Sequence, residues 1–408
     1  MRSFKALLEK PFLIWFIASM LYGGAFWWKA RFAEPSLGET KSIQILAEFS
    51  QSTFPPKIDL VRSLDDYGGH LAYYALMGRV HQLAGGDLLT MRTIHLCVVL
   101  AALFVFTLLG FHYTYRNRLN PLWISLGTLL LAANPYLFEA AMRVGYIGFF
   151  LFVLLASLWA LEKERTAWAT LLLSLGVLVD WRAVILVLVT LWTRTTGETG
   201  RFVRIEKILL LALPLVFASL PLFAWKGIVP TGETREWWTF ILEHRNLVRL
   251  DLWFYSIALL PIYSLFFSWS WGFRARARSM SLGAVAAALL IPMYFIFPVV
   301  PQPEPWAAPG SGNAVPLGLV DWALTEVAGP YKNLVLFVPW IVGAFLFAQA
   351  ILLDILERSR VLRAFILFFF LVAPVSFGVV DQGFLIVLPF VLLFGLSEAL
   401  VGDEGKIV

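Results

Sequence analysis

The residues whose types and spacing could support chemistry gather in a polar stretch that lies between two apolar ones. The segment SLDDYGGHLAYY places Asp65 and Asp66 side by side, and the motif SLGE places Glu39 earlier in the same stretch. Glu39 and Asp66 each follow a serine by three residues, which is the spacing of a capping box, where the acid binds the first amide of a helix. A carboxylate held rigid and ionised at a helix N-terminus can also take a proton as a general base. The three acids are therefore candidates for capping and for catalysis.

Four other polar residues are candidates for lining a substrate cavity. His70 and Tyr73 share one face of the helix expected from Ser63 onward. Asp381 and Gln382 interrupt apolar sequence near the C-terminus, and an acid within such sequence is a functional candidate by default.

Asp180 also interrupts apolar sequence, and Arg182 is close enough in the chain to pair with it. Asp180 is a functional candidate for the same reason as Asp381, and the alternative is that it caps a helix or pairs with Arg182 at the membrane interface.

Four cations beside apolar runs are candidates for binding the phosphate of a lipid headgroup: Arg92, Arg143, Arg249 and Lys332. Arg143 and Arg249 are the most suggestive, because each sits between apolar segments. The simpler interpretation is that each side chain extends to the membrane surface to keep its charge hydrated.

The elements that must position these residues are helices in a membrane. The chain has 408 residues, of which 60% are hydrophobic and 14% charged, far from the balance of a soluble protein. Apolar runs close to the roughly 20 residues that a membrane-crossing helix needs recur along the chain. We predict one all-α domain over residues 1–408, a polytopic bundle of about twelve spans: 11–28, 92–113, 121–138, 146–161, 166–179, 183–193, 207–226, 252–272, 280–300, 333–352, 364–380 and 383–400.

Two of these spans, 166–179 and 183–193, are short, and they form either a broken hairpin or a pair of tilted helices. The basic clusters at 116–118, 274–278 and 357–363 fall on one side of this topology, which the positive-inside rule identifies as the cytoplasmic side. Both termini are then cytoplasmic, and the basic excess reflects orientation rather than binding of nucleic acid.

The long segments 29–91, 227–251 and 301–332 fall on the outer side, where we expect the active site. Within the first, two amphipathic helices are predicted over 36–49 and 63–86, lying along the membrane surface. The pattern of 235–254 favours an interfacial helix with tryptophans, and 301–332 is rich in proline and glycine.

No metal or redox site is expected. The single cysteine, Cys97, excludes an intrachain disulfide, and the five histidines lack metal-ligand spacing. We predict no bound metal and no cofactor.

Several motifs together resemble the GT-C glycosyltransferases. GETKSIQILAEF (38–49), LDDYGGHLAYYAL (64–76) and GGDLLTMRTIHL (85–96) are similar to motifs of the first outer loop and second span of those enzymes. AANPYLFEAAMRVGYIGFFLFVLLA (132–156) and DQGFLIVLPFVLLF (381–394) resemble later spans. The chain departs from the pattern at Gly38, which replaces an Asp, at Gly69-His70, which replace two prolines, and at Gly383, where an Arg is common.

The resemblance implies an enzyme that moves a sugar from a polyprenyl-phosphate carrier to a glycan, lipid or protein acceptor. The reaction would take place on the outer face of a bacterial or archaeal plasma membrane. The resemblance makes Glu39 the first choice for the general base, with Asp65 or Asp66 as the alternative.

Three other functions stay open. A polysaccharide polymerase or ligase of the O-antigen type would use Arg and His of the outer loops, such as His244 and Arg245. A secondary transporter would show internal repeats and broken helices. A GT-C-like protein without activity would account for the replaced Asp.

Overall fold

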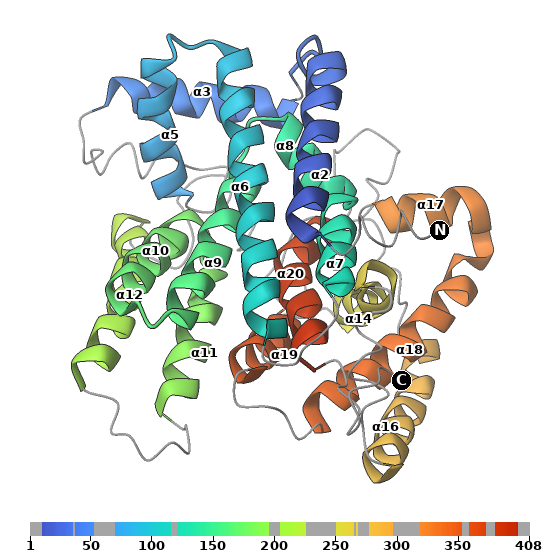
Figure 1. The fold of residues 1–408 in the computed structure, drawn as a ribbon. Helices are drawn as coiled ribbons and strands as arrows, with labels where there is room; N and C mark the ends of the chain where they lie inside the picture. Colours follow the sequence, from blue (N-terminus) through green and yellow to red (C-terminus); the bar gives the residue numbers. More distant parts are fainter. Residues whose placement is uncertain are drawn as a thin grey trace. The chain divides into compact units, whose positions relative to one another are not determined.

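The computed structural model describes residues 10–35, 37–52, 70–115, 121–195, 205–225, 250–264, 267, 277–296, 319–352, 359–372 and 380–398. Most of these residues are helical and none of them forms a strand, which confirms the all-helical prediction for this part of the chain (Figure 1). The chain divides into two compact units. Unit 1 comprises residues 1–111 and 124–245, and unit 2 comprises residues 112–123 and 246–408.

Unit 1 contains most of the candidate residues that the structure describes. Its elements, of which α6 and α7 extend into unit 2, are α2 (Pro11–Ala25), a π-helical turn (Phe26–Ala30), α3 (Leu37–Gln51), α5 (Leu71–Leu83), α6 (Leu88–Tyr115), α7 (Leu122–Ala132), α8 (Pro135–Met142), α9 (Tyr146–Glu162), α10 (Thr166–Val179), α11 (Ala183–Thr195) and α12 (Ile205–Trp225).

Three helical stretches among the described residues are long and apolar enough to cross a membrane: Pro11–Trp28, Leu88–Thr114 and Trp322–Leu352. Several others are apolar but shorter. The 14 residues of α10 and the 13 of α11 extend about 20 Å each, less than the roughly 30 Å of a hydrocarbon core. The helices are consistent with an integral membrane protein, and the number of spans stays a prediction.

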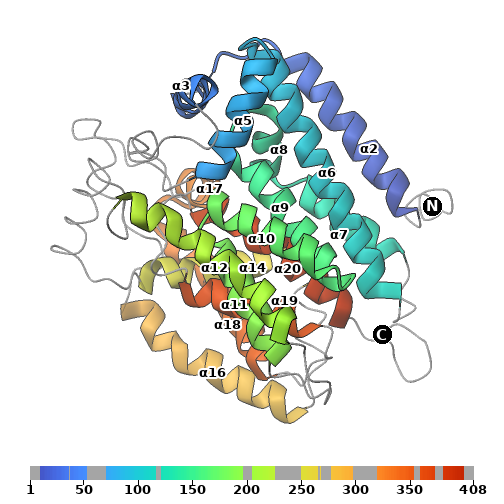
Figure 2. The same ribbon diagram turned by 90° about the vertical axis from the view of Figure 1, so that its left-hand side faces the viewer.

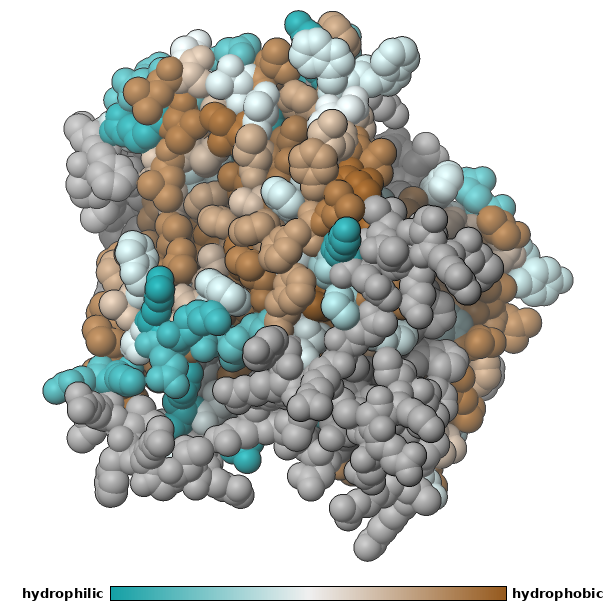
Figure 3. Space-filling model, in the orientation of Figure 1, coloured by the Kyte–Doolittle hydropathy of each residue, from teal (hydrophilic) through white to brown (hydrophobic). Residues whose placement is uncertain are grey.

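The α2 helix packs along α6 and α7 through side chains that bind backbone carbonyls. The indole N–H of Trp15 donates to the carbonyl of Leu100 at 3.0 Å, and the hydroxyl of Tyr22 donates to that of Ala132 at 2.6 Å. The α2 helix also exposes Phe16, Met20, Leu21 and other large apolar side chains. Figure 3 shows extensive hydrophobic surface over this part of unit 1, with hydrophilic residues beyond it, as expected of a surface in contact with lipid.

The predicted span 121–138 is not one helix. The α7 and α8 helices meet at an angle of 62°. The cause is local: the side chain of Asn134 accepts the amides of Tyr136 and Leu137 and so caps α8, while Pro135 occupies the first turn. The break separates α7 from α8. The α8 helix then ends at Met142, and the extended backbone of Arg143 and Gly145 leads to α9.

The α3 helix confirms the first predicted amphipathic helix and lies across the end of α6 (Figures 1 and 2). The second one differs from its prediction over 63–86. It begins at Leu71, with His70 just outside it, and runs antiparallel to the start of α6. Gly85 and Gly86, at φ of +65° and +77°, provide the reversal. Asp87 then caps α6 by accepting the amide of Thr90 at 2.8 Å.

Unit 2 consists of α14 (Leu250–Ser264), α16 (Ala277–Ile296), α17 (Leu319–Ala328), a short 3-10 turn (Gly329–Tyr331), α18 (Lys332–Leu352), α19 (Arg360–Val372) and α20 (Val380–Glu398). The α18 helix packs against α14 and α16, and α20 packs against α14 and α19. Gly343 of α18 lies against the carbonyl of Ile257 in α14, an approach that no larger residue permits. Most of the predicted interfacial helix 235–254 and most of the segment 301–332 lie outside the described residues.

A buried ion-pair network as the candidate functional site

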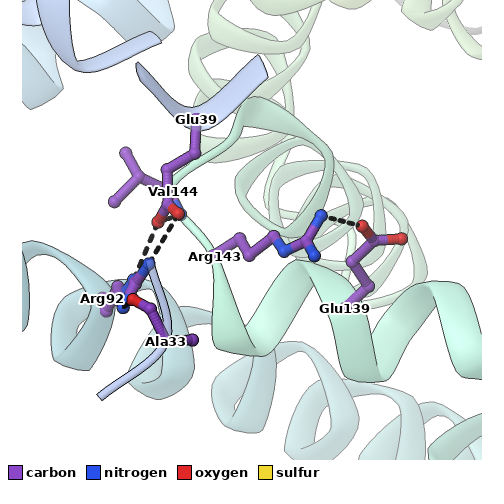
Figure 4. A network of polar contacts seen from close by, with 6 residues as sticks. All are labelled: Ala33, Glu39, Arg92, Glu139, Arg143 and Val144. Carbon is purple, nitrogen blue, oxygen red and sulfur yellow. Dashed lines mark hydrogen bonds and ion pairs between the residues drawn. The ribbon is translucent and has the colours of Figure 1, made fainter. Parts of the chain in front are cut away.

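Glu39 and Arg92 form a two-point ion pair in the interior of unit 1 (Figure 4). The Nε of Arg92 donates to Oε1 of Glu39 at 2.9 Å, and Nη2 donates to Oε2 at 2.7 Å. The two side chains are only 2% and 1% exposed. This parallel arrangement of two hydrogen bonds is the strong form of an arginine–carboxylate contact and fixes both side chains in orientation.

Two backbone groups complete the pair. The amide of Val144 donates to Oε1 of Glu39 at 2.9 Å, and Nη1 of Arg92 donates to the carbonyl of Ala33 at 2.9 Å. We call these four residues the Glu39 network. They come from the segment after α2, from α3, from α6 and from the α8–α9 connection, so the network joins four parts of the chain at one end of unit 1.

The Glu39 network keeps the carboxyl of Glu39 ionised. Burial raises the pKa of this group, but the hydrogen bonds from Arg92 and Val144 and the charges of Arg92 and Arg143 outweigh burial, and the net pKa lies below its usual value. A carboxylate with a lowered pKa and several hydrogen bonds is a weak proton acceptor. The contacts of Glu39 therefore favour a positioning role over that of general base.

Arg143 lies at the surface beside this network. Its Nη1 donates to Oε1 of Glu139, one helical turn earlier, at 2.6 Å, and both side chains are about half exposed. In Figure 4 the guanidinium points away from Glu39 and toward Glu139. An exposed pair of this kind contributes about 0–1 kcal/mol and is easily rearranged, so Arg143 is accessible to an anionic ligand.

Tyr73 and His95 form a second buried contact, between α5 and α6. The Nδ1–H of His95 donates to the carbonyl of Met91 at 2.7 Å, because a carbonyl can only accept. The Nε2 atom then accepts the hydroxyl of Tyr73 at 2.8 Å. Burial raises the pKa of Tyr73 well above its usual value, and nearby Tyr74 and Glu39 add to the effect, so the phenol stays protonated.

A third group of polar side chains lies where α10 turns into α11, and we call its residues His70, Tyr146, Asp180 and Arg182 the turn cluster. Nη2 and Nε of Arg182 donate to the two oxygens of Asp180 at 2.5 and 2.9 Å, so of the alternatives for Asp180 the structure shows the ion pair. The hydroxyl of Tyr146 accepts a longer bond from Nη2 of Arg182, at 3.3 Å.

His70 closes the turn cluster. Its Nδ1–H donates to the carbonyl of Val179 at 2.6 Å, and its ring stacks on that of Tyr146 with centroids 3.4 Å apart. Burial lowers the pKa of His70 to about 4, although the neighbouring Asp180 acts in the opposite direction. The imidazole is therefore neutral near pH 7, with its proton on Nδ1.

The structure brings some of the predicted site residues together and separates others. Glu39 and Arg92 are directly paired, Arg143 lies beside them, and His70 and Tyr73 belong to the same unit. Lys332 belongs to unit 2, where it contacts Thr325 at 3.4 Å. The remaining predictions are not described at side-chain level: Asp65, Asp66 and Arg249 lie outside the described residues, and for Asp381 and Gln382 only the backbone, in the first turn of α20, is described.

Four participants were missed by the sequence analysis: Ala33, Val144, His95 and Tyr146. The carbonyl of Ala33 gives no sequence signal, because every residue supplies one. The amide of Val144 gives no sequence signal, because any residue except proline supplies one. His95 had a signal, since it lies one helical turn after Arg92 and so shares its face of α6. Tyr146 could have been suspected from its place between the polar Arg143 and a long apolar run. No group of three or more metal-ligating side chains occurs in the described part of the chain.

Comparison with known proteins does not assign a family. No family model matches the chain, and neither a curated protein nor a solved structure does.

Proposed function

We propose that the chain is an integral membrane glycosyltransferase that moves a sugar from a polyprenyl-phosphate carrier to an acceptor. The observation that supports this best is the position of the Glu39 network. An ionised carboxylate and an arginine are buried at one end of an apolar helical unit, and they fix the entry to the polar loop that resembles the acidic loop of GT-C enzymes.

The chemistry of such a transfer needs a cation near the carrier phosphate, because the phosphate leaves as an anion. Arg143 supplies one in unit 1: it is half exposed, and its only described ion-pair partner is the equally exposed Glu139. Arg249 is a second candidate for the same task, from sequence alone.

The transfer also needs a base for the acceptor hydroxyl or amide. Because Glu39 is buried, multiply bonded and has a lowered pKa, we assign it the role of holding Arg92 and the α8–α9 connection in place. The proton acceptor is then Asp65 or Asp66, which lie in the same loop between α3 and α5. The general base proposed here therefore differs from Glu39, which was the first choice from the sequence.

The test is transfer of radiolabelled sugar from a set of polyprenyl-phosphate sugars by purified protein in liposomes. The variants are Asp65→Asn, Asp66→Asn and Glu39→Gln, with Glu34→Gln as the control because Glu34 is exposed and lies outside the network. Removing the base should lower the rate about a hundredfold or more. The proposed function is wrong if no donor of the set loses its sugar, and the assignment of the base is wrong if Asp65→Asn and Asp66→Asn both transfer sugar at the wild-type rate.

A transporter is the second candidate, because one observation favours it. The bend of 62° between α7 and α8 is the kind of break that transporters place in their spans. Uptake of a chemically unchanged solute into the same liposomes would support this function over glycosyl transfer.

A further inference from the structure

The guanidinium of Arg182 is hydrogen-bonded along the edge formed by Nε and Nη2, and its Nη1 atom is available to a ligand. Nε and Nη2 are occupied by Asp180 and Tyr146, whereas Nη1 makes no hydrogen bond to any residue that the structure describes. The side chain is 15% exposed. The two N–H donors of Nη1 are thus fixed in direction by the opposite edge, and little conformational entropy is lost when a ligand binds them.

An acceptor lies in the same cluster. Nδ1 of His70 is bonded to the carbonyl of Val179, so the lone pair of the neutral ring is on Nε2, which has no hydrogen-bond partner in the described part of the chain. Trp181, between Asp180 and Arg182 in the sequence, is half exposed and offers an aromatic face. A directed cationic donor, a neutral acceptor and an aromatic surface together fit a phosphate that carries a sugar.

The charge balance selects the kind of phosphate. Asp180 and Arg182 form a pair of zero net charge, so attraction between the cluster and an anion rests on the directed N–H groups of Nη1. A doubly charged phosphomonoester loses more hydration on entering this largely buried cluster than a singly charged phosphodiester does, and a pair of zero net charge does not offset that cost. The carboxylate of Asp180, with a pKa lowered by Arg182 against the opposing effect of burial, stays ionised near neutral pH.

We propose that the turn cluster and Trp181 form the binding site for a singly charged phosphodiester of a sugar–lipid, with Nη1 of Arg182 donating to a phosphate oxygen. This inference rests on the proposed function and refines it, since it assigns the phosphate of the donor to Arg182 and leaves Arg143 as a further cation in unit 1. Only Gly145 separates Val144 of the Glu39 network from Tyr146 of the turn cluster, so the donor would bind directly beside that network.

Binding can be measured without any transfer. The protein in nanodiscs of neutral lipid is titrated with farnesyl methyl phosphate, a singly charged diester, and with farnesyl phosphoglucose. Farnesyl phosphate and inorganic phosphate serve as comparators for a monoester on a lipid and for a free ion. We expect both diesters to bind more tightly than either comparator, and Arg182→Gln to weaken binding of both diesters about tenfold or more.

The control is Arg194→Gln. Arg194 is at the opposite end of α11, is exposed and donates to the carbonyl of Leu161, so its loss should leave binding unchanged. Trp181→Ala keeps the inference testable if Arg182→Gln does not fold. Because Trp181 is exposed, this variant should fold and bind farnesyl phosphoglucose several-fold more weakly. The loss should be smaller for farnesyl methyl phosphate, which has no sugar for the indole to contact.

The inference is overturned if folded Arg182→Gln binds the diesters as the wild type does, if Trp181→Ala binds farnesyl phosphoglucose as the wild type does, or if inorganic phosphate competes equally well. Its failure is separate from failure of the proposed function. A protein that binds the diesters through Arg182 but transfers no sugar keeps this site and loses the transferase function, and a transferase indifferent to Arg182→Gln keeps the function and loses this site.

Discussion

Glu39 and Arg92 each depend on the other for a place in the interior of unit 1. A buried charge without a partner is costly, because the surrounding side chains cannot replace the water that it has lost. The pair is separated by 53 positions in the sequence, so its formation also holds α3 against α6. The carboxylate of Glu39 also accepts a hydrogen bond from the amide of Val144, and this bond holds the α8–α9 connection in position.

We therefore predict that Glu39→Gln and Arg92→Gln each lower the free energy of unfolding by about 3–5 kcal/mol. The double variant should lose clearly less than the sum of the two, because neither charge is then left alone. Chemical unfolding in detergent measures all three. Arg143→Gln is the matched control, since it removes one arginine of an exposed pair and should cost no more than about 1 kcal/mol.

His70 gives stability a pH dependence. Its pKa is about 4 in the folded protein and about 6.5 in the unfolded chain. A lowered folded pKa means that the stabilisation is fully present above about pH 6.5 and is lost as pH falls through the folded value near 4. The wild-type melting temperature should accordingly fall over this interval, and that of His70→Gln should fall less. Parallel curves for the two proteins would contradict the burial of a neutral imidazole.

The contact between α3 and α5 depends on a single glycine. A Cβ at Gly78 would lie 2.8 Å from Cβ of Phe49 and 3.2 Å from the carbonyl oxygen of Leu46, which is too close for the two helices to keep their separation. We predict that Gly78→Ala lowers the melting temperature and weakens every property that depends on the position of Glu39.

The control for this prediction is Gly23→Ala in α2, where nothing lies within 4 Å of the added methyl group. Alanine is the better helix former by up to about 1 kcal/mol, so Gly23→Ala should leave stability unchanged or raise it. Equal melting temperatures for Gly78→Ala and Gly23→Ala would show that the α3–α5 contact is looser than described.

At the scale of elements, apolar runs predicted helices well where polar residues mark both ends. The prediction of 166–179 agrees with α10 at both ends, and that of 146–161 agrees with α9 to within one residue. Prediction from apolar runs was poorer where a single residue decides the geometry. Asn134 and Pro135 break the predicted span 121–138, and α5 begins only after His70, because such breaks depend on side-chain contacts rather than on composition.

The pairing of Glu39 with Arg92 was out of reach of the sequence for a related reason. Each residue was singled out for its type and its place beside an apolar run, but a contact across 53 positions depends on how α3 crosses α6. The Asp180–Arg182 pair, by contrast, lies within one turn of the chain, so its spacing alone was enough to offer pairing as one of the roles of Asp180.

At the scale of the whole molecule, the predicted topology places some helix ends on the outer side of the membrane and the others on the cytoplasmic side. Three helices of unit 1 have their ends grouped in the same way. The start of α9, the end of α10 and the start of α11 meet in the turn cluster, whereas Arg194 near the end of α11 contacts Leu161 near the end of α9. The helices α9, α10 and α11 therefore alternate in direction, as expected of spans that cross a membrane in turn.

The sidedness of this arrangement is open to a direct test. In a chain where exposed Cys97 is replaced by alanine, single cysteines at Thr231, Gly310 and Ala275 are treated with a thiol reagent that does not cross membranes. The three positions lie outside the described residues, and the predicted topology puts the first two outside the cell and the third inside. We expect labelling of intact cells at Thr231 and Gly310 only, and labelling at Ala275 alone would place the Glu39 network on the cytoplasmic side.

The amide of Val144 also sets an order of events during synthesis. Glu39 leaves the ribosome first and Arg92 follows, but Val144, the last of the described partners of the carboxylate, is made 105 residues after Glu39. Until that segment emerges, the acid has one hydrogen bond fewer, and the loop between α3 and α5 is less firmly anchored. A nascent chain released before residue 144 should therefore be a better target for membrane proteases than one released just after α9 is complete.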